Sequence, residues 1–113
     1  MRTTISSISD KMAEHYSEWE ETFGYGPCGA FSALKREEGW GQVAICFANV
    51  KGEGQNFATG FSHYVIISEN SIVDLTNPFD EELEYSEIEI LPKDEMPDLV
   101  DEEAINWLRE RGI

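Results

Sequence analysis

The stretch FSHYVIISENSIVDLT, residues 61–76, predicts a β-hairpin. Apolar, aromatic and β-branched residues dominate Phe61–Ser68 and Ser71–Thr76, which is the composition of β-strands. Glu69-Asn70 separates the two runs by a length that suits a tight turn. Each strand carries one polar residue at a place where packing alone does not call for it, His63 in the first and Asp74 in the second.

The register of this hairpin decides whether the two polar residues meet. With a two-residue turn, Ser68 pairs with Ser71. His63 is then a diagonal neighbour of Asp74 on the same face, within side-chain reach. A three-residue turn would put the two side chains on opposite faces unless a bulge intervened, so their contact is a consequence that coordinates can test.

A helix that starts at Pro27 and carries a cysteine in its first turn is expected upstream of the hairpin. Gly26-Pro27-Cys28-Gly29 places Cys28 in the first turn, with Pro27 at a position that needs no N–H, and the helix should end near Gly39. Unpaired backbone N–H groups and the helix dipole favour a thiolate there. Gly29 should leave space for a substrate carbonyl, and the Cys28 N–H would serve as an oxyanion-hole donor.

These residues fit a catalytic triad in which Cys28 is the nucleophile, His63 the base and Asp74 the group that orients the base. Each has a structural alternative. Cys28 would be a small buried apolar residue, His63 a hydrogen-bonded histidine at a strand edge, and Asp74 the start of an Asx turn into 76–78.

The order of the three motifs resembles that of the papain-like cysteine hydrolase superfamily, and within it the transglutaminase-like and arylamine N-acetyltransferase-like branches. The resemblance rests on Gly26–Phe31, on His63-Tyr64-Val65 and on Ile72–Thr76, and it covers about residues 24–79. It implies a papain-like core and a hydrolase or acyl transferase. These families often supply a second oxyanion donor from a Gln or an aromatic residue before the cysteine. No Gln lies there in this chain; Thr22 and Tyr25 are the nearest candidates, and the resemblance favours Tyr25.

The remaining elements predict an α+β fold in a single domain, residues 1–113, with N-terminal helices packed on a small antiparallel sheet and a C-terminal helix. Ser7 and Asp10 resemble a capping box for a helix over about 8–22. Further elements are expected at Gln42–Val50 (strand), Ile88–Leu91 (strand) and Glu102–Arg111 (helix). Cys46 lies within the first of these strands and is expected in the core.

Charge narrows the range of partners. The 113 residues include 23 acidic and 8 basic side chains, a net charge of −15, which disfavours binding to nucleic acid or anionic lipid and favours basic partners. No signal peptide and no membrane-spanning apolar run is recognisable, so a soluble, cytoplasmic protein with reduced thiols is expected.

The leading hypothesis is a cysteine-dependent hydrolase or acyl transferase, of peptidase, amidase, deamidase or transglutaminase type. It would act on a protein or peptide substrate, basic or neutral, through a Cys28 acyl-enzyme without a cofactor. A metal site built from Cys28, His63 and Asp74 lacks the usual paired-ligand spacing. The alternative is an acidic binding or inhibitor protein on an inactive papain-like fold, such as a phage or bacterial DNA mimic or antidefence protein. A plain structural or accessory protein is a third reading.

Overall fold

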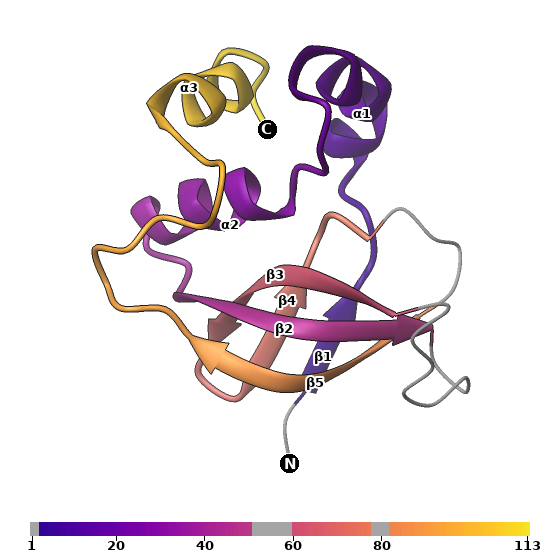
Figure 1. Cartoon of the computed structure of the whole chain (residues 1–113), viewed down its shortest axis with the longest axis vertical. Coiled ribbons are helices and arrows are strands. Elements are labelled where there is room, and N and C mark those ends of the chain that lie inside the picture. Colours follow the sequence, from indigo (N-terminus) through magenta and orange to yellow (C-terminus); the bar gives the residue numbers. More distant parts are fainter. Residues whose placement is uncertain (1–2, 51–59, 78–81) are drawn as a thin grey trace.

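The computed structural model describes residues 3–50, 60–77 and 82–113, which form three helices and a curled, five-stranded mixed sheet with strand order β1-β4-β3-β2-β5 (Figure 1). The helices lie on one side of the sheet (Figure 1). The elements are β1 (Thr3–Ser6), α1 (Asp10–Phe23), α2 (Cys28–Glu37), β2 (Gln42–Val50), β3 (Phe61–Ser68), β4 (Ser71–Asp74), β5 (Leu83–Ile90) and α3 (Glu102–Glu110). The expected α+β class is therefore confirmed.

The sheet is not purely antiparallel, which corrects the prediction. β1 runs parallel to β4, with Thr3 opposite Ser71 and Ser6 opposite Asp74. Four residues without an apolar run carry little strand signal, so β1 goes unnoticed in the sequence. Backbone bonds extend this pairing past the strand ends, since the Ser7 N–H donates to the Asp74 carbonyl and the Asn77 N–H donates to the Ser7 carbonyl. The chain around Asp74 is thereby held by the N-terminal segment.

The helices begin and end at local signals. Ser9, not Ser7, caps α1, because its side chain accepts from the Met12 N–H at 3.2 Å, so the predicted capping box is wrong. Gly24 ends α1 in the left-handed region at φ 76°, a conformation that glycine adopts without strain. Pro27 is the N-cap of α2 and offers no side-chain cap of its own.

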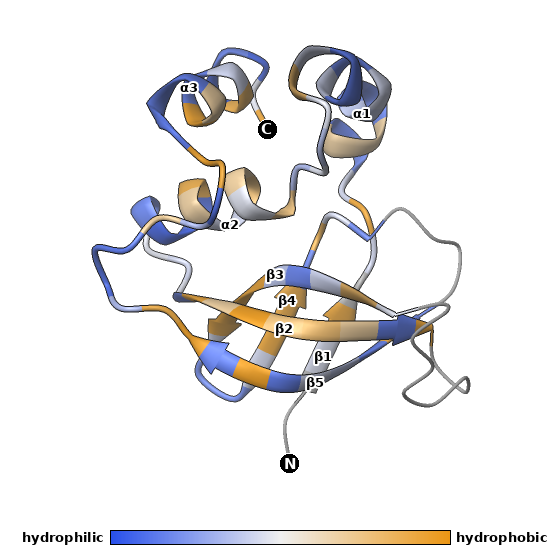
Figure 2. Ribbon diagram, in the orientation of Figure 1, coloured by the Kyte–Doolittle hydropathy of each residue, from blue (hydrophilic) through white to orange (hydrophobic). Residues whose placement is uncertain are grey.

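Two groups of buried residues hold the layers together. The helical cluster joins the three helices through Met12, Trp19, Ala30, Phe31, Ala33, Leu34, Ala104, Ile105, Leu108 and Ile113. The sheet cluster consists of Ala44, Cys46, Val65, Ile67 and Ile72. In Figure 2 each helix alternates between hydrophobic and hydrophilic segments, whereas β2 is hydrophobic over most of its length. This agrees with amphipathic helices that cover a largely buried strand.

Within the described residues, no helix is long and apolar enough to cross a membrane.

Candidate active site

The β3–β4 hairpin has the register that a two-residue turn requires. Ser68 lies opposite Ser71, and the pairing continues to Ile66 opposite Val73. His63 and Asp74 lie just beyond this paired segment. The Nε2 of His63 is 2.8 Å from Oδ2 of Asp74, so the predicted contact is present. Because an ionised carboxylate only accepts, Nε2 donates this bond and Nδ1 remains for another partner.

Asp74 accepts hydrogen bonds from four donors. Oδ1 accepts from the backbone N–H and the hydroxyl of Thr76, both at 3.1 Å. Oδ2 accepts from His63 and, at 2.6 Å, from the hydroxyl of Tyr85. The first of these bonds is the Asx-turn contact that was the structural alternative for Asp74, so the same carboxylate makes the turn and holds the histidine. Only 2% of Asp74 is exposed, and these donors compensate for its burial.

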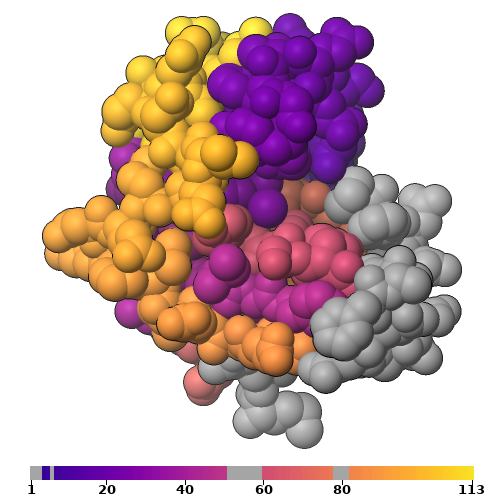
Figure 3. All heavy atoms as spheres, in the orientation of Figure 1, coloured from indigo at the N-terminus to yellow at the C-terminus, as the bar shows by residue number. Residues whose placement is uncertain are grey.

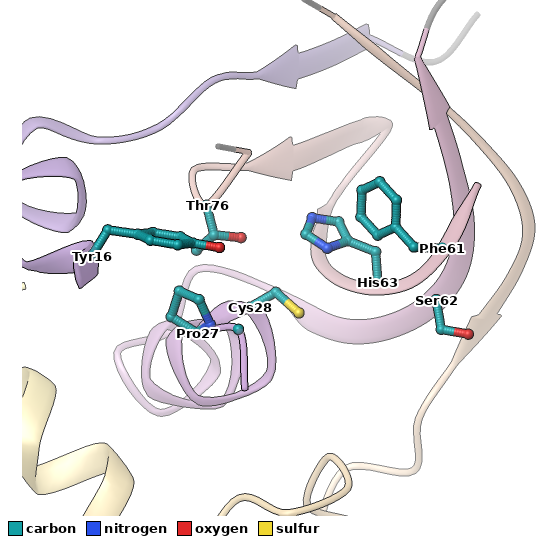
Figure 4. Close-up of a pocket in the computed structure, with 8 residues that line it drawn as sticks. Tyr16, Pro27, Cys28, Phe61, Ser62, His63 and Thr76 are labelled. Carbon is teal, nitrogen blue, oxygen red and sulfur yellow. The ribbon is translucent and has the colours of Figure 1, made fainter. Parts of the chain in front are cut away.

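Cys28 is the first residue of α2, so it lies in the first turn as expected, one residue after the predicted start at Pro27. Its helix end lacks a side-chain cap and has no acidic residue in the first turn, so the first N–H groups of α2 are free of capping side chains. In the close-up, the Cys28 sulfur points into the space beside the His63 ring (Figure 4). The structure thus brings all three predicted triad residues together.

The charge state of His63 depends on these neighbours. Burial by itself lowers the pKa of His63, but hydrogen bonds and charge interactions with Asp74 and Cys28 outweigh it and raise the pKa to about 10. His63 therefore carries a proton on both ring nitrogens at neutral pH.

Two hollows share Gly26, Cys28 and Ser62 as lining residues. The first, of about 280 Å³, is lined by Tyr16, Gly26, Pro27, Cys28, Phe61, Ser62, His63 and Thr76. The second, of about 270 Å³, is lined by Tyr25, Gly26, Cys28, Gly29, Ile45, Ser62, Tyr64, Asp98, Leu99 and Val100. Atoms of α2 and β3 reach the surface side by side where the helical layer meets the sheet (Figure 3).

Two contacts bear on the expected oxyanion region. The Tyr25 hydroxyl donates to the Leu99 carbonyl at 2.8 Å, which commits its proton to that bond. Gly29 lines the second hollow, but the position that a side chain would take there is filled, because a Cβ would lie 3.1 Å from Cβ of Pro97 and 3.1 Å from Cγ2 of Val100. The absence of a side chain at Gly29 lets the segment before α3 pack against α2.

Tyr16 and Tyr85 belong to the site and are absent from the sequence-based set. Tyr16 of α1 reaches the first hollow with its hydroxyl (Figure 4). Burial, followed by Glu20 and Cys28, raises the pKa of Tyr16, so the hydroxyl keeps its proton. In the sequence, Tyr16 is spaced like the core residues of its helix, so nothing marks it as a residue of the site. Tyr85 lies in an acidic segment without a motif that would indicate a contact with Asp74.

Cys46 has the structural role that was expected. Only 4% of it is exposed, its thiol donates to the His63 carbonyl at 3.5 Å, and burial raises the pKa of this thiol to about 12. Both cysteines are free thiols. Within residues 3–50, 60–77 and 82–113, no group of three His, Cys, Asp or Glu residues is arranged to hold a metal ion.

No family model, no curated protein and no solved structure matches this chain.

Proposed function

We propose that this protein is a cysteine-dependent hydrolase or acyl transferase with Cys28 as nucleophile, His63 as acid and base, and Asp74 as the residue that orients His63. The observation that carries the proposal is the 2.8 Å bond from His63 to a buried carboxylate, in a cavity whose wall includes the Cys28 thiol. The order of Cys, His and Asp along the chain adds the resemblance to papain-like enzymes of the transglutaminase-like branch.

The chemistry follows from these positions. The Cys28 thiolate forms a bond to the acyl carbon of an amide or thioester, and the carbonyl electron pair moves to the oxygen. When the intermediate collapses, the bond to the leaving group breaks and His63 gives that group its proton from Nδ1. Water or an amine then attacks the thioester and returns a proton to His63, and the thiolate leaves. The choice of water or amine separates hydrolase from transferase.

The oxyanion of the intermediate would accept hydrogen bonds from the backbone N–H of Cys28 and from the hydroxyl of Tyr16. Tyr16 is favoured over Tyr25 because its side chain faces the first hollow, whereas the Tyr25 hydroxyl is bonded to Leu99. A phenol that stays protonated is a suitable donor to a developing negative charge.

The pH dependence of Cys28 alkylation by iodoacetamide tests the proposal. Cys46 is buried with a pKa raised to about 12, so labelling at pH 6–8 reports Cys28, and Cys28→Ser should abolish it. We expect the native protein to label at pH 6 on the order of tenfold or more faster than a model thiol peptide, since only the thiolate reacts. His63→Ala should bring the rate down to that of the peptide.

Mass spectrometry after p-nitrophenyl acetate provides the second readout. A burst of one acetyl group per protein, attached to Cys28, is expected of an acyl-enzyme. If Cys28 reacts no faster than the peptide and no acetyl adduct forms, the enzyme proposal is wrong and the acidic binding or inhibitor protein becomes the better reading.

A further inference from the structure

Tyr85 reaches the buried carboxylate from the opposite edge of the sheet. Its strand, β5, pairs with β2 and is separated from β4 by two strands in the sheet order. Its hydroxyl nevertheless donates to Oδ2 of Asp74 at 2.6 Å, the same oxygen that accepts from His63. The curl of the sheet brings the edge strand β5 close to β4, although β3 and β2 lie between them in the strand order.

The Tyr85 ring also lies alongside the His63 ring. The two rings are nearly parallel, with an interplanar angle of 19° and centroids 6.4 Å apart. Tyr85 therefore restricts the orientation of the His63 ring in two ways, through the shared carboxylate oxygen of Asp74 and through ring packing. A carboxylate held by donors on both oxygens cannot rotate without losing hydrogen bonds.

A β-bulge puts Tyr85 on this face. Ile45 lies opposite Glu89 and Phe47 lies opposite Ser86. One residue of β2 between these pairs thus faces two residues of β5. The first of the two, Glu87, has φ 52°, in the left-handed region that non-glycine residues adopt at a cost.

The bulge reverses the alternation of β5. Because of the extra residue, Tyr85 lies opposite Ala48, and Ala48 also lies opposite Phe61 on the other side of β2. Residues two apart on β3 share a face, so Tyr85, Phe61 and His63 point the same way. In an unbroken ladder Ser86 would take the place opposite Ala48, and Tyr85 would face away from the site.

We propose that Tyr85 is a positioning residue for the His63–Asp74 pair and that the bulge at Glu87 holds it in place; this inference rests on the function proposed above. Tyr85 touches no reacting atom. It fixes the carboxylate, which in turn fixes the imidazole against Cys28.

Tyr85→Phe removes the hydroxyl and keeps the ring. We expect the alkylation rate of Cys28 at pH 6 to fall about tenfold, because a less ordered imidazole pairs less well with the thiol. Ser86→Ala is the matched control, since it removes a neighbouring hydroxyl that donates to the Phe47 carbonyl, and it should stay near the wild-type rate. The 15N NMR signals of His63 provide a readout that a merely structural role would not move: the Nε2–H signal should exchange faster with water in Tyr85→Phe.

Two substitutions at Glu87 test the bulge without touching Tyr85. Glu87→Gly and Glu87→Val remove the same exposed charge, but glycine accepts a positive φ and valine resists it. We expect Glu87→Gly to label like the wild type and Glu87→Val to approach Tyr85→Phe. If both match the wild type, the bulge does not hold Tyr85.

The outcomes separate this inference from the proposed function. Fast, His63-dependent labelling in the wild type together with an unchanged rate and an unchanged Nε2–H signal in Tyr85→Phe would overturn the role of Tyr85 alone. Slow labelling in the wild type, independent of His63, would overturn the proposed function, and the role of Tyr85 in catalysis would fall with it.

Discussion

The helical cluster and the sheet cluster are buried to a similar extent but are bordered by different side chains. Leu108 and Met12 in the first are fully buried among other apolar residues. His63 and Asp74, next to the second, are 4% and 2% exposed, yet they carry charge and every bond they make is directional. Apolar burial stabilises a fold without specifying chemistry, whereas buried polar groups cost free energy and must be fully paired. The candidate site therefore lies where buried side chains stabilise the fold less than apolar side chains would.

Asp74→Asn should produce the largest effect and should act on chemistry more than on folding. The asparagine amide keeps the shape of the carboxylate, but its NH₂ group would face groups that themselves donate, such as His63 Nε2–H. The histidine then loses the acceptor that orients it. We expect acetylation of Cys28 by p-nitrophenyl acetate to slow by roughly 10³–10⁴-fold, as in triads of this kind. Urea unfolding should show a smaller loss, about 1–3 kcal/mol. Equal losses in both measurements would mean that Asp74 is mainly structural.

Leu108→Ala should show the reverse behaviour in the helical cluster. Removing a fully buried side chain leaves a cavity, and we expect a loss of about 2–5 kcal/mol in the free energy of unfolding measured with urea. Asn106→Ala, at an exposed position of the same helix, is the control and should change stability by less than about 0.5 kcal/mol. The labelling rate of Cys28 in the folded variant should stay near that of the wild type. A large fall in that rate would show that the two regions are coupled.

The two regions should also respond differently to pH. The folded pKa of His63 is raised from 6.5 to about 10, so its contribution to stability is fully present below pH 6.5 and is lost as the pH rises towards 10. Each pKa unit corresponds to about 1.4 kcal/mol, so we expect the wild-type advantage over His63→Gln to shrink by a few kcal/mol across this window. Urea unfolding of both proteins at several pH values measures the difference. Parallel curves would mean that His63 has no raised pKa.

Tyr16→Phe tests a side chain that the helical layer contributes to the site. Loss of an oxyanion donor should slow acetylation of Cys28 by about 10²-fold. Tyr25→Phe decides between the two tyrosines, and we expect a smaller loss there because its hydroxyl bonds Leu99 rather than facing the first hollow. A larger loss for Tyr25→Phe would mean that Tyr25, the candidate named in the sequence analysis, is the second oxyanion donor and Tyr16 is not.

Gly29→Ala should have the smallest effect, at the contact between α2 and the segment before α3. The added methyl group meets Pro97 and Val100 at 3.1 Å, and we expect a cost of about 1 kcal/mol. Gly26→Ala is the matched variant, because its nearest contact is the Tyr16 hydroxyl at 3.9 Å, and its stability should be unchanged or slightly higher. Equal stabilities for the two variants would contradict close packing at Gly29.

Local pattern was a good guide where each residue is determined by its neighbours in the chain. β2 and β3 have the predicted bounds, the turn at Glu69-Asn70 has the predicted register, and α2 begins at Cys28. Turn length alone sets which residues of a hairpin face each other, so the contact of His63 with Asp74 could be predicted from sixteen residues.

The errors arise where distant segments meet. β5 begins at Leu83, earlier than the predicted Ile88, and the alternation that puts Glu87 and Glu89 outward would also put Tyr85 outward. Only the bulge against β2 turns it inward. Similarly, the position that a side chain would take at Gly29 is filled by a segment about 70 residues away in the chain, which no local pattern predicts.

The sequence by itself determined the α+β class and the hairpin, and it selected Cys28, His63 and Asp74 as candidate site residues. Propensity, turn length and helix start are properties of short segments, so local pattern was sufficient for these. The tertiary structure alone decided that α2 lies against the hairpin, that β1 makes the sheet mixed, and that Tyr16 and Tyr85 join the site. Those features depend on packing between elements far apart in the chain, and packing is a property of the whole molecule.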